Sequence, residues 1–214
     1  MTRDEAMQKL RQAKLYAILD TGYAKPADWP GLAQKLIAGG VEILQIRAKQ
    51  SSPEDIAGWT RELLSVSAPA GVLLIVNDYP EIARRAGANG CHVGQNDRSV
   101  AEVRKIVGAR ALIGKSTHSL PQALAAQQEG ADYIGFGPIY ATPTKPDYQP
   151  IGDRDLRRLT QEIHIPYFCI GGIKLAQIAD LKAQGVARVV IVSALLQSDQ
   201  PTRYAQEVCR RLAG

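Results

Sequence analysis

Eight short apolar segments recur along this 214-residue chain, and this repeat constrains the fold more than any other feature. The segments are rich in Ile, Val, Leu and Tyr. Most of them lack strict alternation of polar and apolar residues, which is typical of strands buried on both faces. We therefore predict β-strands at residues 14–20, 41–48, 72–78, 91–94, 112–117, 133–140, 166–172 and 188–194.

Amphipathic helical patterns separate these strands. Residues 52–68 begin with Ser-Pro and two acidic residues, which is a helix start signal. Residues 119–131 have Ser119 as an N-cap, and residues 174–186 end at a glycine in the same manner. The residues before 14 form a further, N-terminal helix.

The repeat predicts an α/β fold, namely a single (β/α)8 TIM barrel over residues 1–214 with an extra N-terminal helix. A doubly wound open sheet is the alternative. We prefer the barrel because eight similar units run the full length of the chain with no second domain or long linker.

Composition narrows the class of function. The chain is 45% hydrophobic and 22% charged, and it has neither a membrane-length apolar run nor a signal peptide, so we expect a cytoplasmic globular protein. Cys91, Cys169 and Cys209 form no CxxC pair, which argues against disulfides and zinc. A net charge of +5 without a Lys/Arg tract, and with 6% aromatic residues, fits phosphorylated small molecules better than nucleic acid.

Polar residues follow the predicted strands at the end where a barrel carries its active site. In the segment QIRAK, Gln45, Arg47 and Lys49 occupy alternate positions, so their side chains share one face of an extended segment. The strand-end residues are Gln45, Arg47, Lys49, Asn77, Asp78, Asp97, Ser116, Thr117, His118, Thr142, Thr144, Lys145, Gly171, Gly172, Val192 and Ser193.

These residue types suggest phosphate chemistry. Asp78 and Asp97 could bind Mg²⁺, which prefers a few carboxylates plus phosphate oxygens. Arg47, Lys49 and Lys145 could neutralise a diphosphate. The glycines at 171–172 and the backbone near Ser193 could hold a second phosphate. Taken singly, most of these residues are turn, cap or surface residues, and His92 is expected to be packed rather than catalytic; their common location carries the interpretation.

In this order, the segments QIRAK, VND, CHVGQND, GKSTHS, GFGPIYATPTKPD and IGGI resemble the thiamine phosphate synthase family over nearly the whole chain. The resemblance implies a Mg²⁺-assisted transferase that joins hydroxymethylpyrimidine diphosphate to a thiazole phosphate. The products would be thiamine phosphate and pyrophosphate. The family chemistry is dissociative, with pyrophosphate leaving before the thiazole nitrogen attacks.

The resemblance also implies residue roles. The pyrimidine diphosphate would be held by Gln45, Arg47, Lys49, Asn77, Ser116 and Lys145, of which Arg47, Lys49, Ser116 and Lys145 would be catalytic. The metal would be held by Asp78 and Asp97. The thiazole phosphate would meet Thr142, Thr144, Gly172, Val192 and Ser193. The chain departs from the family pattern at Tyr79, Asn96 and Lys115.

Alternatives remain open at the level of sequence. A thiazole tautomerase shares the barrel and could use His118 as its general acid and base, but it needs no diphosphate clamp. A catalytically silent barrel that binds thiamine precursors is a second alternative, and another sugar-phosphate barrel is a third. Barrels of this size often pair, so a homodimer is expected as one oligomeric state.

Overall fold

The computed structural model of the chain describes residues 1–142 and 149–213. Its strands form a closed parallel barrel in the order of the sequence, and β1 pairs with β8 to complete the ring. The strands are β1 Leu15–Asp20, β2 Ile43–Arg47, β3 Leu73–Asn77, β4 Gly90–Val93, β5 Leu112–Thr117, β6 Tyr133–Phe136, β7 Tyr167–Cys169 and β8 Val189–Ile191. The predicted barrel is therefore confirmed.

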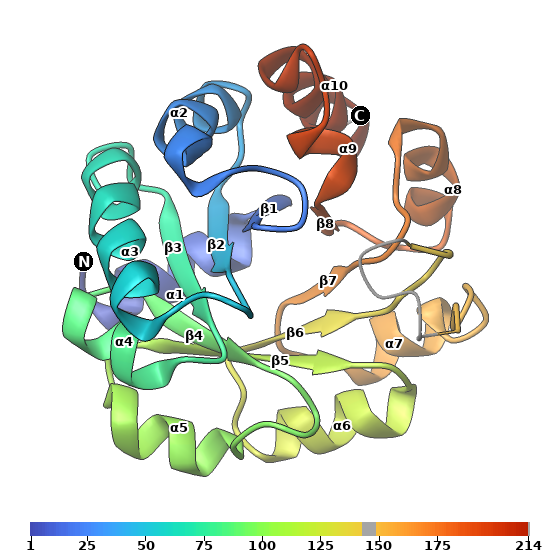
Figure 1. Cartoon of the computed structure of the whole chain (residues 1–214). Coiled ribbons are helices and arrows are strands. Elements are labelled where there is room, and N and C mark those ends of the chain that lie inside the picture. Colours follow the sequence, from blue (N-terminus) through green and yellow to red (C-terminus); the bar gives the residue numbers. More distant parts are fainter. Residues whose placement is uncertain (143–148, 214) are drawn as a thin grey trace.

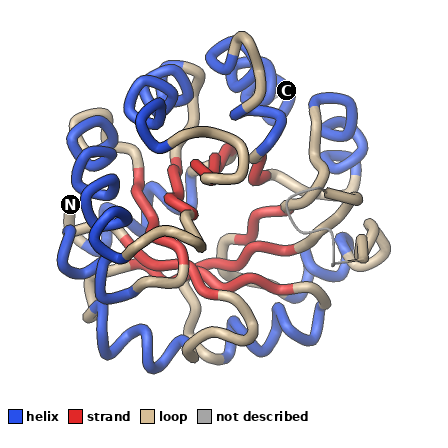
Figure 2. The backbone as a smooth tube through the Cα atoms, in the orientation of Figure 1, coloured by secondary structure: helices blue, strands red, loops and turns tan. Residues whose placement is uncertain are grey.

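Helices surround the strands, as Figures 1 and 2 show. The α-helices are α1 Arg3–Gln12, α2 Trp29–Ala38, α3 Pro53–Ser67, α4 Pro80–Ala86, α5 Val100–Val107, α6 Leu120–Gln128, α7 Leu156–Glu162, α8 Ile178–Ala183, α9 Ser193–Leu196 and α10 Pro201–Ala213. Two short 3₁₀ helices are η1 Pro26–Asp28 and η2 Leu175–Gln177.

The helix starts follow local chemistry. The Ser52 side chain accepts a hydrogen bond from the backbone N of Asp55 and so caps α3, with Pro53 in the first turn. Ser99 and Glu102 form a reciprocal capping box at the start of α5. Ser119 caps α6 as predicted.

Three predicted strands extend three or more residues past the observed ends. β8, predicted over 188–194, ends at Ile191, because Ser193 already begins α9. β6 ends at Phe136, before the cis peptide bond between Gly137 and Pro138, whereas residues 133–140 were expected to be extended. β7 ends at Cys169 rather than at 172, because Gly171 and Gly172 adopt positive φ angles of 99° and 65° that leave the strand conformation.

The N-terminal end of the barrel is closed by the predicted extra helix, α1, which lies behind the strands in Figure 1. Arg3 of α1 and Arg104 of α5 contact the two carboxylate oxygens of buried Asp132 at 2.5 and 2.7 Å. The backbone N of Ile113 also donates to Asp132, at 2.8 Å. The carboxylate therefore ties α1, α5 and β5 to the start of β6.

The barrel interior is filled by aromatic side chains. The rings of Tyr16 and Phe168 meet nearly edge to face with centroids 5.5 Å apart, and Tyr133 packs on both. Cys91 and Cys169 are buried, as expected for core thiols. Over the described part of the chain, no helix is both long and apolar enough to cross a membrane.

Candidate active site

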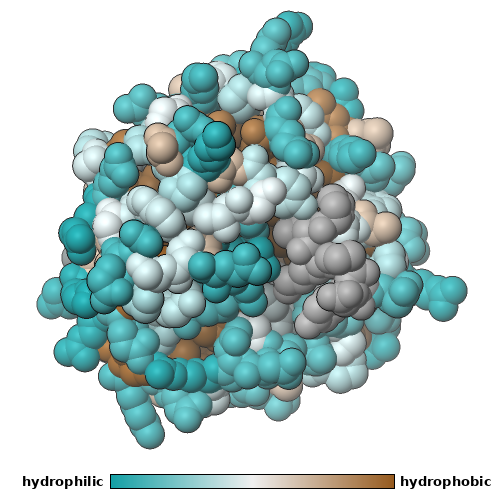
Figure 3. Space-filling model, viewed as in Figure 1, coloured by the Kyte–Doolittle hydropathy of each residue, from teal (hydrophilic) through white to brown (hydrophobic). Residues whose placement is uncertain are grey.

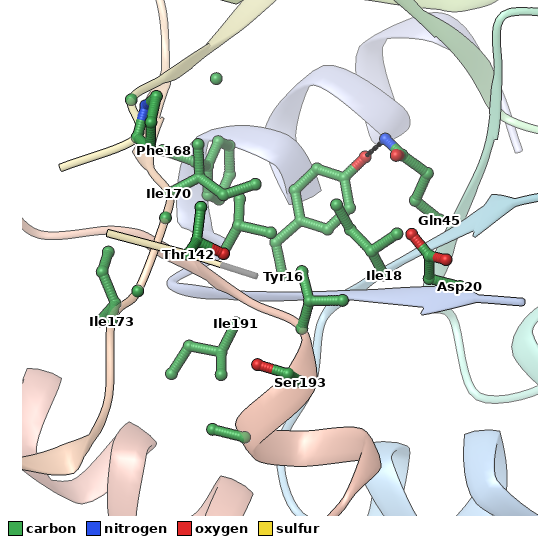
Figure 4. Close-up of a pocket in the computed structure, with 18 of the residues that line it drawn as sticks. Tyr16, Ile18, Asp20, Gln45, Thr142, Phe168, Ile170, Ile173, Ile191 and Ser193 are labelled. Carbon is green, nitrogen blue, oxygen red and sulfur yellow. Dashed lines mark hydrogen bonds between the residues drawn. The ribbon is translucent and has the colours of Figure 1, made fainter. Parts of the chain in front are cut away.

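A cavity of about 550 Å³ opens at the carboxyl ends of the strands. Its wall is largely apolar, and the close-up in Figure 4 shows Ile18, Phe168, Ile170, Ile173 and Ile191 around it. The face seen in Figure 3 is mostly hydrophilic or neutral, with hydrophobic residues in separate patches. The cavity is thus an apolar space entered from a polar surface, as small-molecule sites usually are.

An ion pair lies at one side of this cavity. Arg47, at the end of β2, donates to the Asp20 carboxylate at the end of β1 over 2.5 Å. Asp20 is 3% exposed and also accepts a hydrogen bond from the backbone N of Gly22 at 2.8 Å. This fixed carboxylate holds the guanidinium of Arg47 in the cavity wall, where its remaining N–H groups can serve an anion.

A second charged group follows β2 and β3. Nζ of Lys49 lies 3.3 Å from the Asp78 carboxylate, and Asp78 has a positive φ of 66°, which is uncommon outside glycine. Burial raises the pKa of Asp78; Lys49 partly offsets the rise, and the neighbouring Asp97 carboxylate adds to it. Two carboxylates are therefore held close together with one ammonium group as partial compensation.

A buried chain of hydrogen bonds crosses the cavity wall. Nε2 of Gln45 donates to the Tyr16 hydroxyl at 2.5 Å, a contact visible in Figure 4, and that hydroxyl lies 3.1 Å from the Tyr133 hydroxyl. Nδ1 of His92 is 3.1 Å from the Tyr133 hydroxyl, and its Nε2 is 2.9 Å from Oγ of Ser116. Five polar side chains from five strands therefore form one connected network.

The opposite side of the cavity is built from backbone. A Cβ on Gly172 would lie 2.4 Å from the carbonyl oxygen of Ala141, so the segment after β7 packs directly on the segment after β6. Thr142 lines the cavity beside these glycines, and Val192 and Ser193 line it where β8 passes into α9. This is the corner where barrels of this kind often bind phosphate.

Comparison with known proteins decides the family. The sequence profile of the family described as thiamine monophosphate synthase matches residues 15–195. The chain belongs to this family. A thiamine-phosphate synthase of Chloroflexus aurantiacus is 39% identical over 91% of this chain and 90% of its own length. One from Prochlorococcus marinus is 35% identical over 99% of this chain, which spans only 59% of that longer protein.

Structural similarity agrees with this assignment. The thiamine phosphate pyrophosphorylase from Pyrococcus furiosus has a TM-score of 0.87 and 25% identity, over 97% of each chain. Membership of the thiamine monophosphate synthase family confirms the resemblance noted from the motifs. It also confirms that the chain is an enzyme of the transferase class.

Within this family frame, the cavity gathers most of the predicted substrate residues. Those that line it are Gln45, Arg47, Ser116, Thr142, Gly172, Val192 and Ser193. Four other predicted residues are not part of the cavity lining. Lys49 follows β2, Asn77 ends β3, Asp78 follows β3 and Asp97 follows β4. Thr144 and Lys145 lie outside the described residues.

Four of the polar cavity residues that sequence reasoning missed belong to the strands. Asp20 ends β1 as Arg47 ends β2, so the strand-end rule applied to the first strand would have found it. Tyr16 and Tyr133 were read only as apolar strand residues, and His92 as a packed side chain. His92 is indeed buried, yet it also lines the cavity and contacts Ser116.

His118, the residue proposed for a tautomerase, also lines the cavity. Its Nδ1 contacts the carbonyl oxygen of Gly137, and its backbone N donates to Gln122. These contacts fix its ring against the segment after β6.

Proposed function

We propose that this chain is a thiamine-phosphate synthase that joins hydroxymethylpyrimidine diphosphate to a thiazole phosphate and releases pyrophosphate. Family membership supports the activity. The observation that carries the proposal is the arrangement of charge. An apolar cavity has the Arg47–Asp20 pair in its wall, and the Lys49–Asp78 pair with Asp97 lies at adjacent strand ends.

We assign the pyrimidine diphosphate to the β2–β5 side of the site. Gln45 and Ser116 lie in the cavity wall and suit the uncharged ring, whereas the cations Arg47 and Lys49 suit the diphosphate. Asn77 and Lys145 complete this set by the family resemblance. We assign the thiazole phosphate to the opposite corner, where Thr142, Gly172, Val192 and Ser193 line the cavity. Thr144, which lies outside the described residues, joins this set by the family resemblance alone.

Mg²⁺ fits the residues after β3 and β4. Over the described residues, no group of three or more His, Cys, Asp or Glu side chains could hold a metal. Two neighbouring carboxylates, Asp78 and Asp97, are nevertheless the hard oxygen ligands that Mg²⁺ takes together with phosphate oxygens. When bound there, Mg²⁺ would neutralise charge on the diphosphate.

Catalysis then depends on charge stabilisation and positioning rather than on a protein nucleophile. Arg47, Lys49 and Lys145 stabilise the negative charge that develops on the departing pyrophosphate. The apolar wall keeps water away from the electron-poor pyrimidine carbon, so the thiazole nitrogen is the nucleophile that reaches it. Two binding corners in one cavity hold the reactants together.

The alternatives receive no support from the comparisons, because the matched family and the relatives named above are synthases. A tautomerase needs a general acid and base but no diphosphate clamp. The ion pairs of Arg47 and Lys49 would then have no purpose. We assign His118 a supporting role in orienting the segment after β6.

Small-molecule substrates are the partners we propose, with neither nucleic acid nor membrane among them. We also propose a cytoplasmic location and a homodimer as the oligomeric state, on the grounds of composition and barrel size given above.

The test is an assay with the purified protein, hydroxymethylpyrimidine diphosphate, thiazole phosphate and Mg²⁺, with and without excess EDTA. We expect thiamine phosphate and pyrophosphate in equal amounts, and only in the presence of the metal. No product from protein shown by circular dichroism to be folded would overturn the proposal. Equal turnover with and without EDTA would support the synthase activity and refute the proposed role of Mg²⁺.

A further inference from the structure

The hydrogen-bonded chain from Gln45 to Ser116 is built by the fold and is not a chance contact. A Cβ on Gly114 of β5 would lie 2.1 Å from Cζ of Tyr133 and 2.4 Å from Nδ1 of His92. Only a glycine therefore leaves room for the two rings to meet above β5. Phe168 packs edge-on against the Tyr133 ring and so limits its movement.

The hydroxyl groups in the middle of the chain keep their protons. Tyr16 is 2% exposed and Tyr133 is fully buried. Burial raises the pKa of both phenols, so each remains a neutral hydroxyl with one proton to donate at neutral pH. A buried hydroxyl of this kind is costly unless it is hydrogen-bonded.

The direction of donation along this row of hydrogen bonds follows from Gln45, the residue at its start. Nε2 of Gln45 donates to the Tyr16 oxygen, so the buried proton of Tyr16 needs an acceptor of its own, and among the contacts of the described residues the Tyr133 oxygen at 3.1 Å is that acceptor. With the Tyr133 oxygen accepting from Tyr16, the Tyr133 proton is left for Nδ1 of His92, 3.1 Å away. A neutral imidazole that accepts at Nδ1 carries its proton on Nε2, and this proton is donated to Oγ of Ser116.

We propose that Tyr133 and Tyr16 are positioning residues that fix His92 in the Nε2–H tautomer and thereby make Ser116 a hydrogen-bond donor to the substrate. Ser116 accepts from His92, so its own proton is given to an acceptor atom in the cavity. With the opposite direction, Ser116 would donate to Nε2 of His92 and would resemble the activated serine of a hydrolase. The direction of these hydrogen bonds thus decides whether Ser116 is a hydrogen-bond donor or a nucleophile.

This inference rests on the proposed function in one respect, namely that the acceptor belongs to the pyrimidine substrate. A ring nitrogen of the pyrimidine is the acceptor we assign, because Ser116 lies in the inner wall with Tyr133 and His92. The diphosphate is assigned to the cations Arg47 and Lys49.

The first experiment measures the tautomer directly on the unliganded protein. Long-range ¹H–¹⁵N NMR of ¹⁵N-histidine-labelled protein separates a protonated ring nitrogen from an unprotonated one. The three histidines are assigned with the variants His92→Gln, His118→Gln and His164→Gln. We expect His92 to have its proton on Nε2 at neutral pH. A proton on Nδ1 would overturn the proposed direction.

The second experiment removes the central hydroxyl. In Tyr133→Phe we expect His92 to lose its fixed tautomer and kcat/KM for the pyrimidine diphosphate to fall by about tenfold, as for one buried hydrogen bond. The matched control is Tyr167→Phe, whose hydroxyl contacts Thr160 and Gly185 away from the cavity. The control should leave both readouts unchanged.

The outcomes separate this inference from the proposed function. An unchanged tautomer and unchanged kcat/KM in Tyr133→Phe would overturn the positioning role even if the wild type is a synthase. If the wild type lacks synthase activity but the His92 tautomer shifts in Tyr133→Phe, the positioning role of Tyr133 is supported and the assigned substrate is wrong. Binding of the pyrimidine alcohol and of pyrophosphate, each alone, identifies the acceptor, since only the first should weaken in Tyr133→Phe.

Discussion

One carboxylate from each end of the barrel, Asp132 at the N-terminal end and Asp78 at the C-terminal end, has opposite surroundings. At the N-terminal end, Asp132 is 6% exposed and has two arginines and a backbone N–H as partners. At the C-terminal end, Asp78 has one half-exposed lysine, a second carboxylate beside it and a backbone in the left-handed region.

The difference separates stability from function along a single axis. A carboxylate with all its hydrogen-bonding capacity used within the protein stabilises the fold but has nothing to offer a ligand. A partly buried carboxylate whose charge is only partly compensated weakens the fold, and it is stabilised most by binding a cation or a diphosphate–metal complex. Under the function proposed above, the N-terminal end holds the structure together and the C-terminal end binds the substrates and the metal.

The largest expected effect comes from breaking the N-terminal cluster. Asp132→Ala leaves Arg3, Arg104 and the buried N–H of Ile113 without their partner, so we expect a loss of about 3 kcal/mol in the free energy of unfolding. Urea denaturation measures this loss. The exposed Asp199 supplies the control, since Asp199→Ala should change stability by less than about 0.5 kcal/mol. An equal, small effect of both variants would remove the contrast between the two ends.

The next effect concerns Asp78. Because its pKa is raised in the fold, its stability contribution is present at low pH and is lost as the pH rises through the folded value. Asp78→Asn removes the ionised form and should stabilise the fold at neutral pH, while turnover falls by about a hundredfold. Thermal unfolding and the synthase assay measure the two together. A destabilised variant would contradict the view that this end is built at a cost.

Asp20 sharpens the comparison, because it lies at the functional end and yet is well partnered. Asp20→Asn keeps an acceptor for the N–H of Gly22 but removes the charge that holds Arg47. We expect kcat/KM to fall by about tenfold, mainly through a higher KM for the diphosphate substrate. Steady-state kinetics with each substrate varied in turn would show this; an unchanged KM would reduce Asp20 to a structural residue.

The smallest effect is expected at Lys115, where the chain departs from its family. Its Nζ lies 2.5 Å from the Glu129 carboxylate, and it is not among the residues that line the cavity. Lys115→Met should change stability by less than about 1 kcal/mol and leave kcat/KM unaltered. A change in substrate affinity would show that the departure reaches the site.

Most of the fold could be predicted because the strands of a parallel barrel carry a strong local signal. All eight predicted strands exist, and they pair in the order of the sequence around a closed barrel. The strand ends at 136 and 169 could not be predicted, since they depend on backbone conformations at Gly137, Gly171 and Gly172 that arise from packing between two loops.

The candidate-site residues that could be predicted are those whose place at a strand end is enough to bring them into the cavity. Gln45, Arg47 and Ser116 follow from the rule that strand ends form the site. The pairing of Tyr16 with Tyr133 depends on contacts across the barrel between residues 117 positions apart. Such contacts cannot be seen in the spacing of one chain, so the aromatic residues were read as core.

The ion pairs of Asp132 with Arg3 and Arg104 also bear on the order of events in folding. Arg3 and Asp132 are 129 residues apart, so their contact forms only after most of the chain has been gathered. If the contact is absent from the transition state, its loss leaves the folding rate nearly unchanged and raises the unfolding rate instead. We therefore expect Arg3→Ala to speed unfolding of the barrel while leaving its refolding rate nearly unchanged, which stopped-flow unfolding and refolding would measure.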